Sequence, residues 1–279
     1  MPKILINQLN IHYQQLGKGP DVILIHGITG NLSIWFLKIL PILARKYRVT
    51  VYDLRGHGYS DRPPSGYTSD DMVADLKGLV DYLSIERAFL VGHSFGGAIA
   101  LHFGALYPHQ TEGLVISDAG IPAFIHLRNV KDWRGWDLYK EDLDRLKIHS
   151  EEELLDIENC VRKSFEVPIQ HGFRIGAGRR SDRLVDLVDN TTVLKDFTVV
   201  KYLTEEKISR ISSPTLCIYG HFSPWRAVGE QLEKVMPHCK NIQIPEQGHF
   251  YPIQSPDVFL NLLENFFQQE IKPSSEKGK

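Results

Sequence analysis

The sequence predicts an α/β fold: a mostly parallel central sheet with a helical lid inserted after the sixth strand. Short β-branched runs alternate with amphipathic stretches, which is typical of βαβ units around a parallel sheet. The alternation stops between about residues 122 and 205, where helical patterns follow one another without a convincing strand, and it resumes at residue 213. An all-helical insertion at this place is expected to cover the carboxyl ends of the strands, where open α/β sheets bind ligands.

The first 121 residues contain the six strands that precede the insertion. β-branched runs predict strands at 3–6, 11–15, 21–27, 47–54, 88–94 and 113–120, of which the first two form an antiparallel pair. Apolar residues at helical spacing predict helices over about 33–46, 69–83 and 95–107. Ser69 is expected to cap the second of these helices, because acidic residues follow it in the first turn.

The rest of the chain divides into the insertion, a return of the core and a tail. Residues 122–205 are predicted to form the helical cap, and residues 1–121 and 206–267 together the α/β core. In the returning core, strands are expected at 213–220 and 240–244 and helices near 225–236 and 255–269. The end of the chain, residues 268–279, is expected to be a disordered tail, because its last residues are polar.

Composition and charge limit the class of protein. The 279 residues are 42% hydrophobic and 24% charged, and the net charge of −2 argues against nucleic acid or an anionic membrane as a partner. Three widely spaced cysteines predict neither a disulfide framework nor zinc or redox chemistry. No signal-peptide pattern opens the chain and no apolar run is long enough to span a membrane. We therefore expect a cytoplasmic protein with a small-molecule substrate; the sequence does not predict an oligomeric state.

The strongest chemical signal is the segment Gly92-His93-Ser94-Phe95-Gly96. It fits the G-x-S-x-G pattern, follows an expected strand and opens an expected helix, which is the context that a nucleophilic serine requires. A serine on such a tight turn has a strained backbone, and the glycines let neighbouring segments pack closely. The helix N-terminus presents backbone N–H groups to a developing oxyanion. The alternative is a glycine-rich turn with an incidental serine.

Three further motifs accompany this one, in the order and spacing of a known family. They are His26-Gly27-Ile28-Thr29-Gly30, YDLRGHGYSDRP at 52–63 and Gln247-Gly248-His249-Phe250. With them, the chain resembles the α/β-hydrolase family over nearly its whole length. The resemblance implies that Ser94 is the nucleophile and His249 the general base, with an oxyanion hole formed by the N–H groups of Ile28 and Phe95. It also implies structural roles for His26, His57, His93, Asp53 and Asp61.

The third member of the expected triad departs from the family pattern. Most relatives carry an aspartate three residues after the glycine that ends the seventh strand, whereas Ser223 stands there in this chain. A serine cannot stabilise an imidazolium by charge, although its oxygen could accept a hydrogen bond from the histidine. Asp118 ends the preceding strand and keeps the chain order Ser, Asp, His, so it is the expected acid. A Ser–His pair without an acid is the alternative.

No cofactor and no metal is expected. HGITG lacks the Gly-Lys-Ser/Thr of a phosphate loop, GHSFGG does not match a dinucleotide-binding pattern, and no histidine pair has metal-site spacing with a third ligand. Arg179 and Arg180 could meet an anionic group of a substrate, although a solvated face is the favoured interpretation. Four aromatic residues of the insertion could line an apolar pocket, although packing within the cap is the simpler interpretation: Trp133, Trp136, Phe165 and Phe173.

These residues predict an enzyme that hydrolyses a carboxylic ester, thioester or lactone through an acyl-serine intermediate. A serine nucleophile argues against a dehalogenase or an epoxide hydrolase, because those relatives use an aspartate at this position. Two alternatives stay open. One is carbon–carbon bond hydrolysis or a lyase reaction on the same Ser/His machinery; the other is a non-catalytic small-molecule receptor, which the serine at position 223 keeps open.

Overall fold

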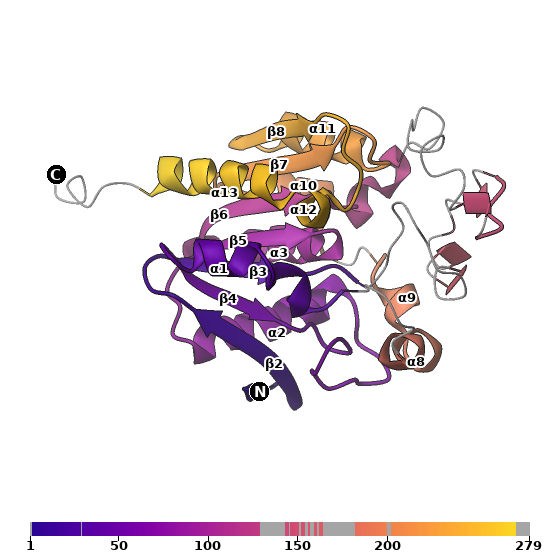
Figure 1. The fold of residues 1–279 in the computed structure, drawn as a ribbon, viewed down its shortest axis with the longest axis horizontal. Coiled ribbons are helices and arrows are strands. Elements are labelled where there is room, and N and C mark those ends of the chain that lie inside the picture. Colours follow the sequence, from indigo (N-terminus) through magenta and orange to yellow (C-terminus); the bar gives the residue numbers. More distant parts are fainter. Residues whose placement is uncertain are drawn as a thin grey trace.

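A computed structural model shows a central eight-stranded sheet with helices on both of its faces (Figure 1). The structure describes residues 2–28, 30–128, 182–199 and 202–271, together with short pieces between 143 and 163. Each strand begins and ends within about three residues of the strand expected from the sequence. The strands are β1 (Lys3–Ile6), β2 (Leu9–Leu16), β3 (Asp21–Ile25), β4 (Arg48–Tyr52), β5 (Ala88–His93), β6 (Thr111–Ser117), β7 (Thr215–Gly220) and β8 (Cys239–Ile244).

The order of the strands in the sheet is β1-β2-β4-β3-β5-β6-β7-β8. β2 pairs with β1 and with β4 in antiparallel fashion, whereas all the pairs from β4 to β8 are parallel. The predicted α/β fold with a mostly parallel sheet is therefore confirmed. Because parallel strands end at the same edge, the loops that follow β3, β5, β6, β7 and β8 come together there.

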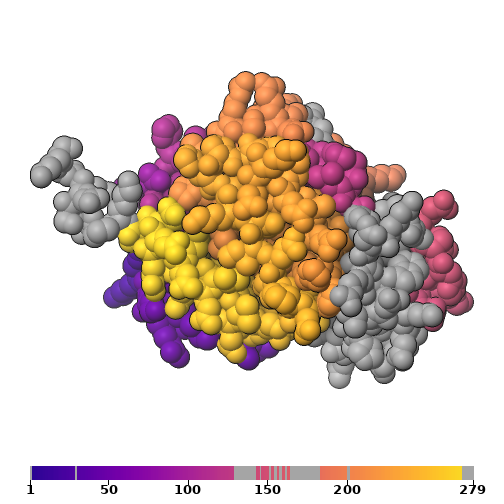
Figure 2. All heavy atoms as spheres, turned by 90° about the horizontal axis from the view of Figure 1, so that it is seen from above, coloured from indigo at the N-terminus to yellow at the C-terminus, as the bar shows by residue number. Residues whose placement is uncertain are grey.

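Helices cover both faces of the sheet because the strands are apolar on both sides. In β3, Val22 and Leu24 pack into the core on one face, whereas Ile23 and Ile25 pack into the core on the other. The first of these cores includes α1 (Ile39–Leu43) and α13 (Pro256–Glu270); the second includes α2 (Ser69–Tyr82), α3 (Phe95–Leu106) and α11 (Arg226–Val235). Seen from above, the segments from β7 to α13, in orange and yellow, fill the centre of the face (Figure 2).

Two details of the first half differ from the prediction. The helix expected over residues 33–46 is a 3-10 turn, Leu32–Trp35, followed by the short helix α1. Pro41 lies in the first turn of α1, and its ring would clash with the carbonyl four residues earlier, so the helix cannot extend toward residue 33. The cap of α2 is Thr68 and not Ser69. Thr68 has an extended backbone and forms a capping box with Asp71, whereas Ser69 is already helical and buried.

About half of the predicted cap lies outside the described residues. Within 122–205 the described residues form the 3-10 turn Pro122–Leu127 and the helices α8 (Asp182–Asn190) and α9 (Val193–Asp196), and none of them lies in a strand. The short elements of the core are a 3-10 turn at Pro108–Gln110, α10 (Glu205–Ser209) and α12 (Tyr251–Gln254). In the described part of the chain, no helix is both long and apolar enough to cross a membrane.

Candidate active site

Ser94 stands between β5 and α3 in a strained backbone conformation, with φ 56° and ψ −127°. A positive φ is uncommon for a residue with a side chain. Glycines make the turn possible, because a Cβ on Gly92 would lie 2.1 Å from Gly96 O and a Cβ on Gly96 would lie 2.3 Å from Ile25 O. The Ser94 N–H donates to Ser117 O at 2.9 Å, which ties this turn to the end of β6.

The loop after β3 passes directly against Ser94. A Cβ on Gly27 would lie 2.9 Å from Ser94 Cβ and 3.3 Å from Ser94 Oγ, so this close approach depends on glycine. The N–H of the next residue, Ile28, has no backbone acceptor among the described residues. Phe95 is the first residue of α3, so its N–H has no partner within the helix. Two backbone donors from different elements therefore border the serine.

His249 lies in the loop between β8 and α12, beside the turn that carries Ser94. Its carbonyl accepts a hydrogen bond from His93 Nε2 at 2.8 Å, and the centroids of the two rings are 4.8 Å apart. Its Nδ1 lies 2.9 Å from Asp118 Oδ1. The His249 side chain is 23% exposed, whereas Asp118 is fully buried. In the described part of the chain, Ser94 Oγ makes no hydrogen bond to His249, so the structure joins the histidine to the acid but not to the serine.

Three donors surround the carboxylate of Asp118, which follows β6 directly. Oδ2 accepts the Gly220 N–H at 2.8 Å, and Oδ1 accepts both His249 Nδ1 and the hydroxyl of Ser223. The Ser223 hydroxyl thus contacts the acid, and no hydrogen bond joins it to the imidazole in the described part of the chain. These three donors satisfy a carboxylate that has no access to water. The motifs in the sequence do not predict the donors Gly220 and Ser223; their one signal is that Ser223 occupies the position at which relatives carry the acid.

Two other histidines near the serine are kept neutral by their surroundings. Burial lowers the pKa of His26 to about 3 and the pKa of His93 to about 4. His26 Nε2 accepts the Leu54 N–H at 3.0 Å, and its Nδ1 donates to Gly27 O at 2.7 Å. The His26 ring therefore ties the loop after β3 to the end of β4. These contacts are of the kind expected for structural histidines.

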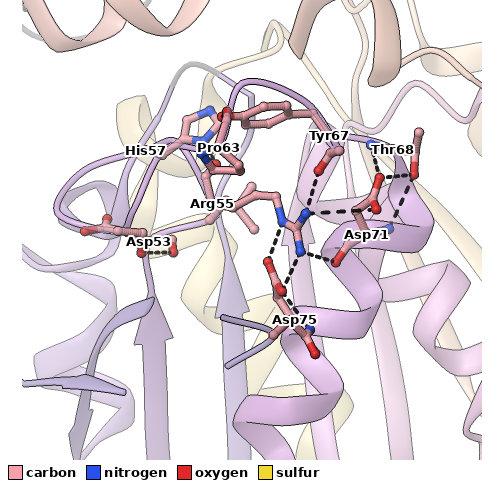
Figure 3. Close-up of polar contacts among 12 residues, drawn as sticks. Asp53, Arg55, His57, Pro63, Tyr67, Thr68, Asp71 and Asp75 are labelled. Atoms are coloured by element: carbon pink, nitrogen blue, oxygen red, sulfur yellow. Dashed lines mark hydrogen bonds and ion pairs between the residues drawn. The ribbon is translucent and has the colours of Figure 1, made fainter. Parts of the chain in front are cut away.

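The charged residues of the loop after β4 make contacts that hold the loop itself. Arg55 donates from Nε and Nη2 to the two carboxylate oxygens of Asp75, both at 2.6 Å, and Figure 3 shows this guanidinium enclosed by acids and carbonyls of the loop and α2. Asp53 accepts two backbone N–H groups and lies 2.7 Å from His12 Nδ1. Asp61 accepts two hydrogen bonds from a residue of β2. These contacts therefore tie the loop to α2, to β2 and to the segment that follows β3.

Several expected residues fall outside the described residues, and so their place relative to Ser94 is not defined. They are Thr29, Trp133, Trp136, Phe165, Phe173, Arg179 and Arg180. Among the residues that the structure does describe, no group of three or more His, Cys, Asp or Glu side chains could hold a metal ion.

Comparison with known proteins agrees with this fold. A family model for the alpha/beta hydrolase fold matches residues 20–165. The 2-(acetamidomethylene)succinate hydrolase of Mesorhizobium japonicum is 33% identical, and the alignment covers 95% of this chain and 94% of that protein. The 2-hydroxy-6-oxo-2,4-heptadienoate hydrolase of Pseudomonas putida is 26% identical, with 80% of this chain and 88% of that protein covered.

Solved structures show the same fold. The enol-lactonase from Burkholderia xenovorans superposes with a TM-score of 0.67 at 20% sequence identity, over 96% of this chain and all of that chain (100%). At this level of identity the likeness concerns the fold. The arrangement of strands and helices is thus a framework that other proteins share.

Proposed function

This chain belongs to the α/β-hydrolase family, and from that premise we propose that it is a serine hydrolase of carboxylic esters, thioesters or lactones. Ser94, His249 and Asp118 form its catalytic triad. The observation that carries the proposal is the 2.9 Å contact between His249 Nδ1 and Asp118 Oδ1 beside a strained serine. Sequence relatives named as hydrolases support hydrolysis as the type of reaction.

The geometry supports a mechanism of acyl transfer to serine. A free serine hydroxyl is a weak nucleophile, so His249 Nε2 takes its proton as Ser94 attacks the carbonyl carbon. Asp118 accepts a hydrogen bond from Nδ1–H, holds the ring in the tautomer that leaves Nε2 as the base, and stabilises the imidazolium that forms. His249 then returns the proton to the leaving group, and water hydrolyses the acyl-serine by the same route.

The developing oxyanion is stabilised by the N–H groups of Ile28 and Phe95. These donors need no reorganisation during the reaction, because the Gly27 contact and the start of α3 hold them in place. One such donor contributes about 3 kcal/mol to the transition state in measured cases. The positive end of the α3 dipole adds to this effect.

Residues 122–205 form, in this proposal, a helical cap over the serine. The supporting contact is between Phe95, next to the nucleophile, and Phe197 of the insertion, whose rings lie 5.9 Å apart in an edge-to-face arrangement. A cap that packs on the nucleophile turn excludes water and shapes an apolar part of the site. A crystal structure in which this segment adds strands to the sheet would overturn the cap.

Hydrolysis of a carbon–carbon bond on the same residues is a second candidate. It is favoured by the Pseudomonas putida relative, whose name is that of a dienoate hydrolase. The two candidates share Ser94, His249 and Asp118 and differ in the bond that is cleaved. A panel of esters, thioesters, lactones and a vinylogous diketone therefore separates them, since each class gives a different product.

Covalent labelling tests the proposal directly. A fluorophosphonate is expected to add one phosphonyl group to Ser94, which intact-mass measurement and peptide mapping detect. Ser94→Ala should abolish labelling and turnover together. Ser209→Ala, which changes an exposed serine of α10, is the control and should label fully. Wild-type protein that stays unmodified at reagent concentrations that label other serine hydrolases would overturn the proposal in favour of a receptor.

A further inference from the structure

We propose that Ser223 is a positioning residue: its hydroxyl holds the Asp118 carboxylate in the orientation in which Oδ1 faces His249. This inference rests on the proposed function, because the triad gives the orientation its importance. Ser223 stands three residues after Gly220, which ends β7, where the family resemblance leads one to expect the acid itself. In this chain the position supports an acid that comes from the neighbouring strand.

The direction of the hydrogen bond follows from the second contact of the hydroxyl. Ser223 Oγ accepts the Trp225 N–H at 3.1 Å, so its own proton is directed to Asp118 Oδ1. Ser223 is 2% exposed and Asp118 is fully buried, so water cannot replace this donor. A hydroxyl that donates to a buried carboxylate makes a charge-assisted hydrogen bond, which is stronger than one between neutral groups.

Two donors from the turn after β7 fix the plane of the carboxylate. The Gly220 N–H binds Oδ2 at 2.8 Å, and the Ser223 hydroxyl binds Oδ1, so the two oxygens are held separately. Without the hydroxyl, Gly220 alone restrains the side chain from the β7 side, and the carboxylate can rotate about its last bond. The distance from His249 Nδ1 to its acceptor on Asp118 would then no longer be fixed.

The same turn also touches the segment that leads to His249. The Phe222 N–H donates to Gln247 O at 2.9 Å, and a Cβ on Gly220 would lie 2.5 Å from that carbonyl. Ser223 is itself held in the turn, because its N–H donates to Gly220 O at 2.9 Å. Residues 220–223 therefore connect the acid and the base of the triad through one short piece of backbone, and Ser223 is the side chain that carries this connection to Asp118.

The test compares the fluorophosphonate labelling rate of three variants of the full chain. Ser223→Ala removes the donor, and Ser223→Cys keeps nearly the same volume with only a weak donor. Both should lower the labelling rate constant of Ser94 by about tenfold, the effect of losing a hydrogen bond to a charged group. Ser213→Ala, at a buried serine before β7 that makes no side-chain hydrogen bond with another described residue, is the matched control and should label at the wild-type rate.

Proton NMR gives a second readout that does not depend on catalysis. The Nδ1 proton of His249, bound to a carboxylate, should resonate far downfield in the wild type and in Ser213→Ala. The resonance should shift or broaden in both Ser223 variants, because their carboxylate is no longer held in one orientation. A folded Ser223 variant with the wild-type labelling rate and an unchanged resonance would overturn the inference. If wild-type protein is not labelled at all, the proposed function fails, and the resonance still decides whether Ser223 orients Asp118.

Discussion

His249 Nδ1 and Asp118 Oδ1 lie 2.9 Å apart although 131 residues separate them in the chain. Asp118 follows β6 and His249 follows β8, and β7 lies between these two strands in the sheet. The contact is therefore bridged by the end of β7, where Gly220 and Ser223 donate to the same carboxylate. Three neighbouring strand ends thus build one polar cluster around Asp118.

Asp118→Asn should keep the fold and lower turnover by about 10⁴-fold, the loss measured when the equivalent change is made in another triad. An amide can still occupy the site, but it carries no charge for the imidazolium and favours the wrong tautomer of His249. The measurement is kcat on any ester turned over by the wild type, with circular dichroism to check folding. Asp21→Asn, at the opposite end of the sheet, is the control. A loss of less than tenfold would mean that another group supports the histidine.

Gly27→Ala should lower kcat by about 10²-fold with a smaller effect on stability. The new methyl group would lie 2.9 Å from Ser94 Cβ, so either the serine or the following Ile28 N–H must move. Displacing one oxyanion donor has a cost of this size. Gly30→Ala is the matched control, because its Cβ would find no atom nearer than 3.4 Å. Equal activity of the two variants would show that the loop after β3 does not contribute to catalysis.

Arg55→Met should destabilise the protein by about 3–5 kcal/mol, because it leaves the buried carboxylate of Asp75 without its cation. Among the described residues, the one further side-chain donor to Asp75 is the neutral amide of Asn7. Arg210→Met removes the same group from an ion pair with Glu206 in which both side chains are about three-quarters exposed, and it should cost under about 1 kcal/mol. Urea unfolding of both variants measures the difference. A similar loss in the free energy of unfolding in the two variants would show that burial does not set the cost of removing the cation.

Stability should fall as the pH drops below about 6.5. Burial lowers the pKa of His26 to about 3 and that of His93 to about 4, so both stay neutral in the native protein while the unfolded chain takes up protons. Each such histidine reduces the free energy of unfolding by about 1.4 kcal/mol for every pH unit between its native and unfolded pKa values. Urea unfolding at pH 7, 6 and 5 measures this slope.

Replacing His93 tests whether this histidine contributes to the pH dependence of the free energy of unfolding. His93→Gln should remove about one proton from the pH dependence of unfolding. An unaltered slope in His93→Gln would show that this histidine is protonated in the native state as readily as in the unfolded chain.

The sequence by itself determined most of the fold and where the nucleophile stands. β-branched apolar runs predict the strands to within about three residues, because a strand that is buried on both faces needs a continuous local run of apolar residues. The turn at Ser94 also has a local signal in the sequence, since Gly92 and Gly96 leave space that a Cβ would fill. The region around Pro41 shows the limit of local prediction. One long helix was expected there, but Pro41 cannot lie inside it, and the chain forms two short elements.

Only the tertiary structure decided which groups surround His249. The sequence favours Asp118 over Ser223 as the partner of the histidine, because Asp118 carries a charge and keeps the chain order Ser, Asp, His, but it does not place the three side chains in space. The distances between these side chains depend on which strands are neighbours and on the register of those strands. In the folded protein Asp118 Oδ1 is hydrogen-bonded to His249 Nδ1, and the Ser223 hydroxyl donates to Asp118. Cys217 and Cys239 illustrate the same point, with sulfur atoms 3.4 Å apart across two strands. Contacts between strand ends arise from the order of the sheet, which a single stretch of sequence does not encode.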